Sequence, residues 1–141
     1  MKASYKLSIN PQDFYDYLIH SLILEIYKNT NHSYLKENLH PGFVYHKKIK
    51  DKSGNELEAS VEILELNNNE LKTKLELPNT IHIMNYQFID NTLIYEEEVN
   101  SNKKTLNLNN KFMSFIFIHK LKKQIIKRFK IIEKYIEGNK K

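Results

Sequence analysis

The fold is decided by residues 56–66, which read ELEASVEILEL. Apolar side chains occupy every second position from Leu57 to Ile63, and the positions between them hold glutamates and one serine. Successive side chains of a strand point to opposite faces of a sheet, so this alternation predicts a strand with one buried and one solvated face. A strand of this kind is typical of an antiparallel sheet, in which one face can meet water.

Similar strands are predicted before and after this one. Turn sequences separate them, among them Asn67-Asn68-Asn69 and Asp90-Asn91. Connections this short join antiparallel neighbours, because a parallel crossover needs about a dozen residues or more. We therefore expect a five-stranded antiparallel meander. Its predicted strands are Phe43–Lys50, Glu56–Leu66, Glu70–Leu77, Thr80–Ile89 and Thr92–Asn100.

The segment before the meander predicts a sixth strand and two helices. Apolar residues alternate along Lys2–Ile9, which indicates another half-buried strand. Asn10 is a favourable N-cap and Pro11 suits the first helical position, so a helix is expected from there to about Asn29. A short second helix is expected near Tyr34–Leu39, where Pro41 and Gly42 follow.

The last predicted element is a long amphipathic helix from about Asn110 to Gly138, after a polar loop over 101–110. Its apolar stripe has three- and four-residue spacing, which places it on one helix face. The stripe consists of Ile118, Leu121, Ile125, Phe129, Ile132 and Ile136. On the opposite face lies a lysine stripe made of Lys120, Lys123, Lys127, Lys130 and Lys134. The chain is thus predicted to be one α+β domain over 1–141, with a six-stranded antiparallel sheet packed on this helix.

Composition excludes several classes of site. The chain has no cysteine, so it can form neither a disulfide nor a thiolate metal site. Its three glycines are scattered, which excludes a P-loop, a dinucleotide fingerprint and a nucleophile elbow. The six histidines form no metal-binding motif. We expect no catalytic motif, metal or cofactor, and we expect a cytoplasmic protein because no signal sequence or membrane span is visible.

Charge is divided unevenly along the chain. Residues 1–100 hold 10 lysines and 15 acidic residues, a net charge of −5. Residues 101–141 hold 12 basic and 2 acidic residues, a net charge of +10. A basic segment can attract nucleic acid or anionic lipid. Arg128 is the chain's single arginine, and this shortage of bidentate donors argues against specific nucleic-acid binding. Membrane contact is expected to be at most peripheral, because the longest apolar run is far shorter than a bilayer span.

Four segments carry a resemblance to a known family: Asn10–Leu18, Gly42–Tyr45, Tyr95–Glu97 and Asn110–Phe115. In these segments the chain resembles a family of uncharacterised proteins from low-GC Gram-positive bacteria. In its predicted element order it also resembles the START and pollen-allergen-like (SRPBCC) helix-grip superfamily. The superfamily resemblance implies a curved sheet that wraps the last helix, often with an apolar cavity between them. The family has no established activity to carry over, and fold alone does not define function.

A binding module for a small apolar or amphipathic molecule is the favoured interpretation. Ligand pockets are mostly apolar with a few placed polar groups. The predicted site residues are Tyr45, His82, Tyr86, Tyr95, Ser114, Phe115 and Ile118.

Three alternatives stay open. The first is an enzyme of the cyclase or hydrolase type, which would require a buried pair such as His82 with Glu97. The second is peripheral membrane or nucleic-acid association through the lysine stripe, whose simpler interpretation is a solvated helix face. The third concerns the predicted strand Thr80–Ile89, which is apolar on both faces. Either a second subunit, a chain segment or a lipid covers its outer side, or the aliphatic side chains on that side are exposed to solvent.

Overall fold

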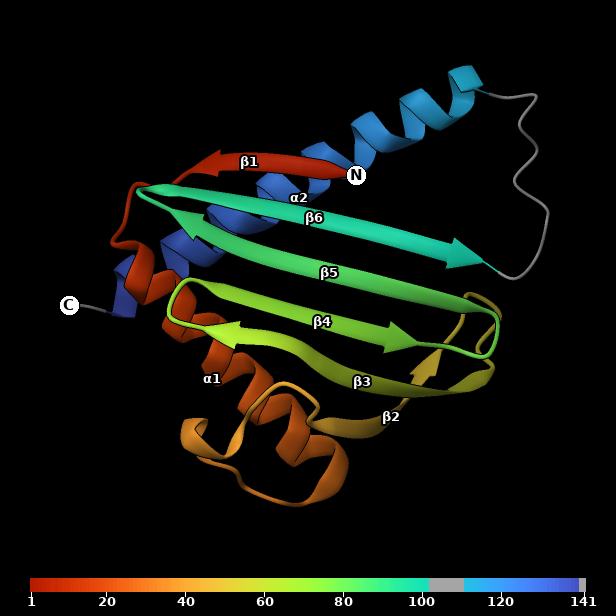
Figure 1. Cartoon of the computed structure of the whole chain (residues 1–141). Coiled ribbons are helices and arrows are strands. Elements are labelled where there is room, and N and C mark those ends of the chain that lie inside the picture. The colour runs from red at the N-terminus through yellow and green to blue at the C-terminus, as the bar shows by residue number, and fades with distance from the viewer. Residues whose placement is uncertain (102–110, 140–141) are drawn as a thin grey trace.

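A six-stranded open sheet and a layer of two helices make up the protein (Figure 1). The computed structural model describes residues 1–101 and 111–139, with side chains described for residues 1–100 and 118–139. The elements are β1 (Lys2–Lys6), α1 (Pro11–Thr30), the 3-10 turn η1 (Lys36–Asn38), β2 (Val44–Lys50), β3 (Glu56–Asn67), β4 (Glu70–Glu76), β5 (Thr80–Ile89), β6 (Thr92–Ser101) and α2 (Lys111–Asn139).

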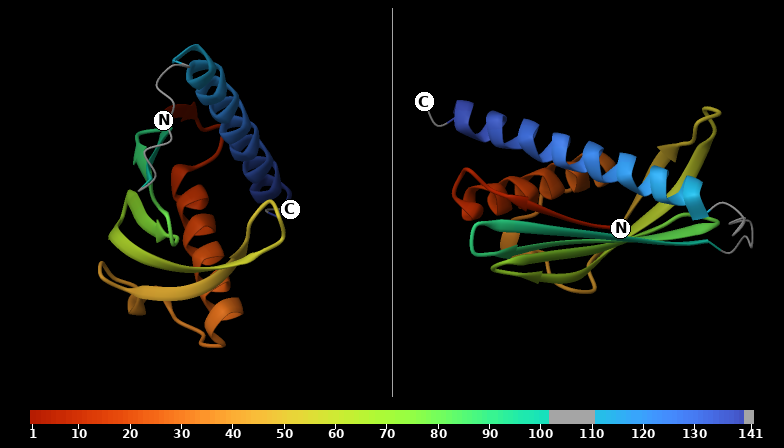
Figure 2. Two further views of the ribbon diagram at one scale, coloured as in Figure 1. Left: turned by 90° about the vertical axis from the view of Figure 1, so that its right-hand side faces the viewer. Right: turned by 90° about the horizontal axis from the view of Figure 1, so that it is seen from above.

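The strands lie in the order β1-β6-β5-β4-β3-β2, and each pair of neighbours is antiparallel. This arrangement confirms the predicted meander over residues 43–100 and the α+β class. The first strand pairs with the last, and Ala3 lies opposite Tyr95. The paired part of β1 ends at Lys6, so it is shorter than the predicted Lys2–Ile9. Both helices lie on the same face of the sheet (Figure 2).

Helix α1 begins as the sequence predicts. The side chain of Asn10 accepts a hydrogen bond from the backbone N–H of Gln12 at 3.0 Å, and Pro11 is the first helical residue. The buried residues of the helix are Phe14, Tyr15, Ile19, Leu22 and Ile26. The second predicted helix is reduced to the single turn η1, since Leu39 already has extended backbone angles and Pro41 follows two residues later.

Aromatic rings from five elements meet at the centre of the core. The Phe129 ring of α2 lies 5.8 Å from that of Phe14 and 6.0 Å from that of Tyr95, measured between centroids. Tyr5 of β1 and Phe88 of β5 complete the cluster. Aromatic pairs in such tilted and edge-to-face arrangements add to the free energy gained by burial. Phe129 therefore fastens α2 to both the sheet and α1.

A buried carboxylate holds α2 against β1. Glu133 is 5% exposed and lies on the apolar stripe, four residues after Phe129. It accepts hydrogen bonds from the backbone N–H of Ser8 at 2.7 Å, from the Ser8 hydroxyl at 2.9 Å and from the Tyr5 hydroxyl. Burial, followed by the hydrogen bond to Glu133, raises the pKa of Tyr5 to about 12. The carboxylate thus has several donors although it lies inside the protein.

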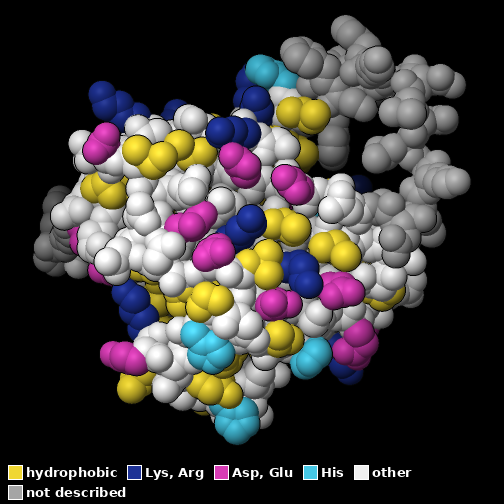
Figure 3. All heavy atoms as spheres, in the orientation of Figure 1, with side chains coloured by type: hydrophobic (Ala, Val, Ile, Leu, Met, Phe, Trp, Pro, Cys, Tyr) yellow, Lys and Arg dark blue, Asp and Glu magenta, His cyan; other side chains and the backbone are white. Residues whose placement is uncertain are grey.

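The outer face of the sheet mixes apolar and charged side chains (Figure 3). Ile81 and Ile83 of β5 are half-buried there, and Ile89 is exposed. Beside them Lys74 and Glu62 form an ion pair at 3.4 Å. Scattered aliphatic side chains among charges are normal on protein surfaces and require no partner. Neither helix, over the residues described, is long and apolar enough to cross a membrane.

Candidate ligand-binding site

A hollow of about 360 Å³ lies between α1 and the inner face of the sheet. Strand register builds its floor: Tyr45 lies opposite Val61, Val61 opposite Leu75, and Thr73 opposite Met84. Each of these residues points inward because its strand alternates with period two. The lining residues are Leu18, Ser21, Leu22, Glu25, Tyr45, Lys47, Val61, Leu71, Thr73, Leu75, Met84 and Tyr86.

One wall of this concave hollow carries a polar cluster made of Glu25, Tyr45 and Lys47. The Tyr45 hydroxyl donates a hydrogen bond to one oxygen of Glu25, and the Lys47 ammonium lies 2.8 Å from the other. The Lys47 side chain is only 18% exposed, so its charge is partly withdrawn from water. Burial, and then the hydrogen bond to Glu25, raises the pKa of the Tyr45 phenol. The phenol therefore stays protonated and remains a donor at neutral pH.

A second polar cluster, made of His82, Tyr95 and Glu97, lies beside the hollow. The Tyr95 hydroxyl donates to Glu97 at 3.0 Å, and His82 Nδ1 lies 3.8 Å from the other Glu97 oxygen. Tyr86 lines the hollow and its ring lies 4.9 Å from that of Tyr95, so it connects the two regions. Burial is the main cause of the raised pKa values of Tyr86 and Tyr95, and the positive charge of Arg128 on α2 lowers both pKa values.

The predicted site residues divide into four groups. Tyr45 and Tyr86 line the hollow, and His82 and Tyr95 belong to the second cluster. Ile118 is 40% exposed and does not line it. The predictions for Ser114 and Phe115 fall outside the described side chains.

The hollow lies under α1. The superfamily resemblance implies a cavity between the sheet and the last helix, and much of the first half of that helix falls outside the described side chains. Further along α2, Phe129 packs directly on Tyr86 and Tyr95 and fills the space there.

Sequence reasoning did not select Glu25 and Lys47, although both carry a signal. Glu25 follows Leu18 by seven residues and Leu22 by three, which places it on the inner stripe of α1. Lys47 lies two residues after Tyr45 and therefore on the same strand face. A charged residue on an apolar face is uncommon unless it has a partner. The partner here comes from another element, and local patterns do not reveal such pairs.

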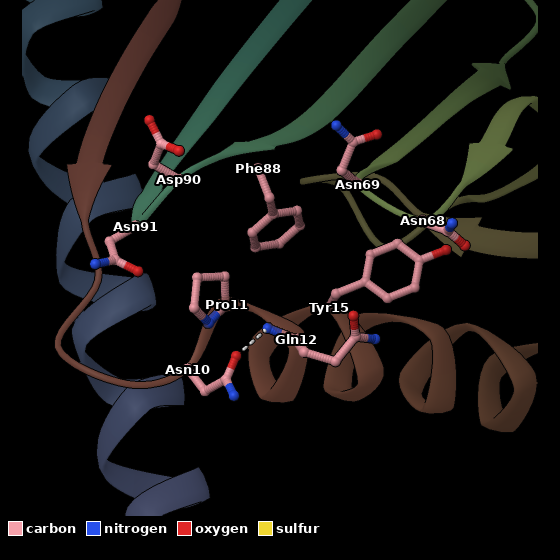
Figure 4. Close-up of a pocket in the computed structure, with 9 residues that line it drawn as sticks. All are labelled: Asn10, Pro11, Gln12, Tyr15, Asn68, Asn69, Phe88, Asp90 and Asn91. Carbon is pink, nitrogen blue, oxygen red and sulfur yellow. Dashed lines mark hydrogen bonds between the residues drawn. The ribbon is translucent and has the colours of Figure 1, made fainter.

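Another hollow, of about 510 Å³, lies where α1 begins beside two strand turns (Figure 4). Polar side chains surround Tyr15 and Phe88 there, and some of the side chains form hydrogen bonds with backbone groups. Asn10 caps α1, and the Tyr15 hydroxyl donates to the carbonyl of Asn67 at 2.5 Å. These contacts account for the residues as turn and cap formers. The concave hollow, with its charged cluster on an apolar lining, is therefore the candidate site. Among the described residues, no three His, Asp or Glu side chains are grouped to hold a metal.

Alkali is expected to unfold the protein because burial raises the pKa of several phenols. Tyr5, Tyr15, Tyr45, Tyr86 and Tyr95 all have pKa values above the ordinary value of 10.0. Their contribution to the free energy of unfolding is fully present below about pH 10 and is lost as pH rises through the raised values. Phenolate absorbance and circular dichroism, followed together, should show these phenols ionising in the same step as unfolding.

The Tyr45→Phe variant is the control for this titration, because it should reduce phenolate formation in the unfolding step by one group. Complete ionisation of all phenols near pH 10, with the circular dichroism unchanged, would contradict the expectation.

The comparisons with known proteins concern family and fold. The sequence model of a family described as a domain of unknown function, DUF3284, matches residues 1–118. A solved structure of an uncharacterised protein from Rhizobium leguminosarum is similar, with a TM-score of 0.51 at 10% sequence identity. The similarity covers 91% of this chain and 93% of that one, and at this identity it concerns the fold alone. No curated protein matches the chain.

Proposed function

Since the chain belongs to the DUF3284 family, whose function is unknown, we propose from its own geometry that it is a binding module. The ligand is a small amphipathic molecule held in the concave hollow between α1 and the sheet. The observation that carries the proposal is the pairing of Glu25, Tyr45 and Lys47 on the wall of an otherwise largely apolar hollow. The expected helix-grip relationship is part of the same proposal, and the helices on one face of an antiparallel sheet support it.

The size and lining of the hollow support a ligand of modest size. Its volume of about 360 Å³ falls at the lower end of the range for small-molecule sites, roughly 300–1,000 Å³. Leu18, Leu75 and Met84 offer apolar contact, while Glu25 accepts and Lys47 donates hydrogen bonds. The ligand therefore has an apolar body and one polar end that meets this cluster.

A thermal-shift screen of fatty acids, isoprenoids and flat aromatic compounds tests the proposal. A ligand that binds only the native state raises stability by about 2.7 kcal/mol at one hundred times its Kd. We expect at least one compound class to raise the Tm of the wild type. Ser21 lines the hollow from α1, so the Ser21→Phe variant should fill it and abolish the shift.

Ser33→Phe is the matched control, because Ser33 is exposed and lies away from the hollow. It should retain the full shift. The proposal is wrong if no compound raises the Tm of the wild type, or if Ser21→Phe folds and responds as strongly as Ser33→Phe.

Enzymatic action is a second candidate, favoured by the His82–Glu97 pair beside the hollow. A carboxylate that faces one ring nitrogen of a histidine can orient the imidazole for proton transfer at the other nitrogen. In this structure that second nitrogen, Nε2, lies 3.1 Å from the Thr80 hydroxyl. Mass spectrometry of each compound that raises the Tm separates the two candidates. A compound recovered unchanged supports binding alone, and a product that disappears in the His82→Ala variant supports catalysis.

A further inference from the structure

The outward face of α2 presents an uninterrupted row of exposed cations. All five members of the lysine stripe are exposed. Lys134 follows Lys120 by fourteen residues, so the stripe is about 21 Å long at 1.5 Å per residue. The stripe is therefore long enough to contact an extended surface.

These cations have no ionic partner among the residues that the structure describes. Elsewhere in the chain Lys2, Lys47, Lys48 and Lys74 each lie within 4 Å of a glutamate. The two acidic residues of α2 are Glu133, which is turned inward to Tyr5 and Ser8, and Glu137, which is exposed near the end of the helix. The outer face of α2 from Lys120 to Lys134 therefore keeps an excess of positive charge.

Charge is also segregated between α2 and the rest of the fold. Residues 1–100 carry a net charge of −5, whereas 111–139 hold eight basic and two acidic residues, a net charge of +6. Acidic side chains are spread over the outer face of the sheet (Figure 3). The field of such a molecule turns α2 toward a negatively charged surface.

Exposed apolar side chains next to the stripe distinguish lipid from nucleic acid. Ile131 is 59% exposed and lies between Lys127 and Lys134 on the helix face, and Tyr135 one turn later is 58% exposed. An aliphatic side chain gains free energy by entering the interfacial region of a bilayer, and lysine stems can lie along the same boundary. A phosphodiester backbone offers Ile131 no comparable contact, and the fork-shaped donors that suit nucleic acid are missing apart from Arg128.

We propose that the outer face of α2 docks on a membrane surface rich in anionic lipids. The helix lies parallel to the surface, with the lysine stripe at the headgroups and Ile131 directed into the interface. Among the described residues, none that lines the concave hollow belongs to α2, so docking and ligand binding are separate properties. This inference does not rest on the proposed binding module.

Flotation with vesicles tests the proposal. Vesicles of phosphatidylcholine with phosphatidylglycerol should carry the protein, vesicles of phosphatidylcholine alone should not, and added salt should release it. Replacing Lys120, Lys127 and Lys134 by Gln should weaken partitioning by roughly a hundredfold, since each lysine near such a surface is worth about fivefold. Replacing Lys48, Lys50 and Lys52 by Gln removes the same charge from the β2–β3 hairpin and should have much less effect.

The Ile131→Ser variant separates lipid from nucleic acid. It should weaken binding to the anionic vesicles while its affinity for duplex DNA, if measurable, is unchanged. All of these residues are exposed, so circular dichroism should show intact folds. The proposal is overturned if anionic vesicles fail to carry the wild type at low salt, if the two triple variants lose partitioning equally, or if the protein binds duplex DNA but not vesicles.

Discussion

Replacing Phe129 by alanine is expected to lower the free energy of unfolding by about 3–5 kcal/mol. The Phe129 ring is 2% exposed and contacts four other aromatic rings, those of Tyr5, Phe14, Tyr86 and Tyr95. Truncation removes these contacts and leaves a cavity between the helix layer and the sheet. A typical domain has a net stability of only about 5–15 kcal/mol, so the variant should be marginal or unfolded at ambient temperature.

Urea unfolding measures this effect, with Ile131→Ala as the matched control on the same helix. Ile131 is exposed, so its truncation should change stability by no more than about 0.5 kcal/mol. A loss below about 1 kcal/mol in Phe129→Ala would mean that α2 is not fastened through this ring.

Replacing Glu133 by alanine should cost about 3 kcal/mol, because it leaves buried donors without an acceptor. The Ser8 backbone N–H and hydroxyl and the Tyr5 hydroxyl all donate to this carboxylate. Glu133→Gln should cost less, about 1 kcal/mol, since an amide oxygen can still accept from one side. Glu137 is exposed one turn later, so Glu137→Ala is the control and should be close to neutral.

A double-mutant cycle with Tyr5→Phe assigns part of this cost to one hydrogen bond. If Glu133 accepts the Tyr5 hydroxyl, the losses in free energy of unfolding of the two single variants should add up to more than the loss in the double variant. Strictly additive losses would show that the two side chains stabilise the protein independently.

The sheet could be predicted from the sequence because its signals are local. Alternation identifies β3, turn residues delimit the meander, and Asn10 and Pro11 mark the start of α1. Irregularities were not predictable. The register of β3 against β4 shifts between Ile63 and Glu65, and the resulting bulge lets Leu66 pack against the core although strict alternation would turn it outward.

The candidate site could be predicted only in part, because its residues come from separate elements. Tyr45 and Tyr86 could be selected as polar groups on apolar strand faces. Glu25 and Lys47 can be recognised as site residues only from their contact with each other, and they lie 22 residues apart in the sequence. Which helix covers the inner face at a given point depends on tertiary packing, so local patterns did not indicate that α1 covers the hollow.

The pairing of β1 with β6 has a consequence for folding during synthesis on the ribosome. Strands β2 to β6 follow one another and can pair as each emerges, because only short loops need to close. β1 is made first and has to wait for its partner: Lys2 pairs with Glu96, and Tyr5 needs Glu133, 128 residues later. The first strand therefore stays an unpaired segment during most of translation, and its docking with α2 closes the fold. Variants of β1 should accordingly affect the last stage of folding more than the formation of the meander.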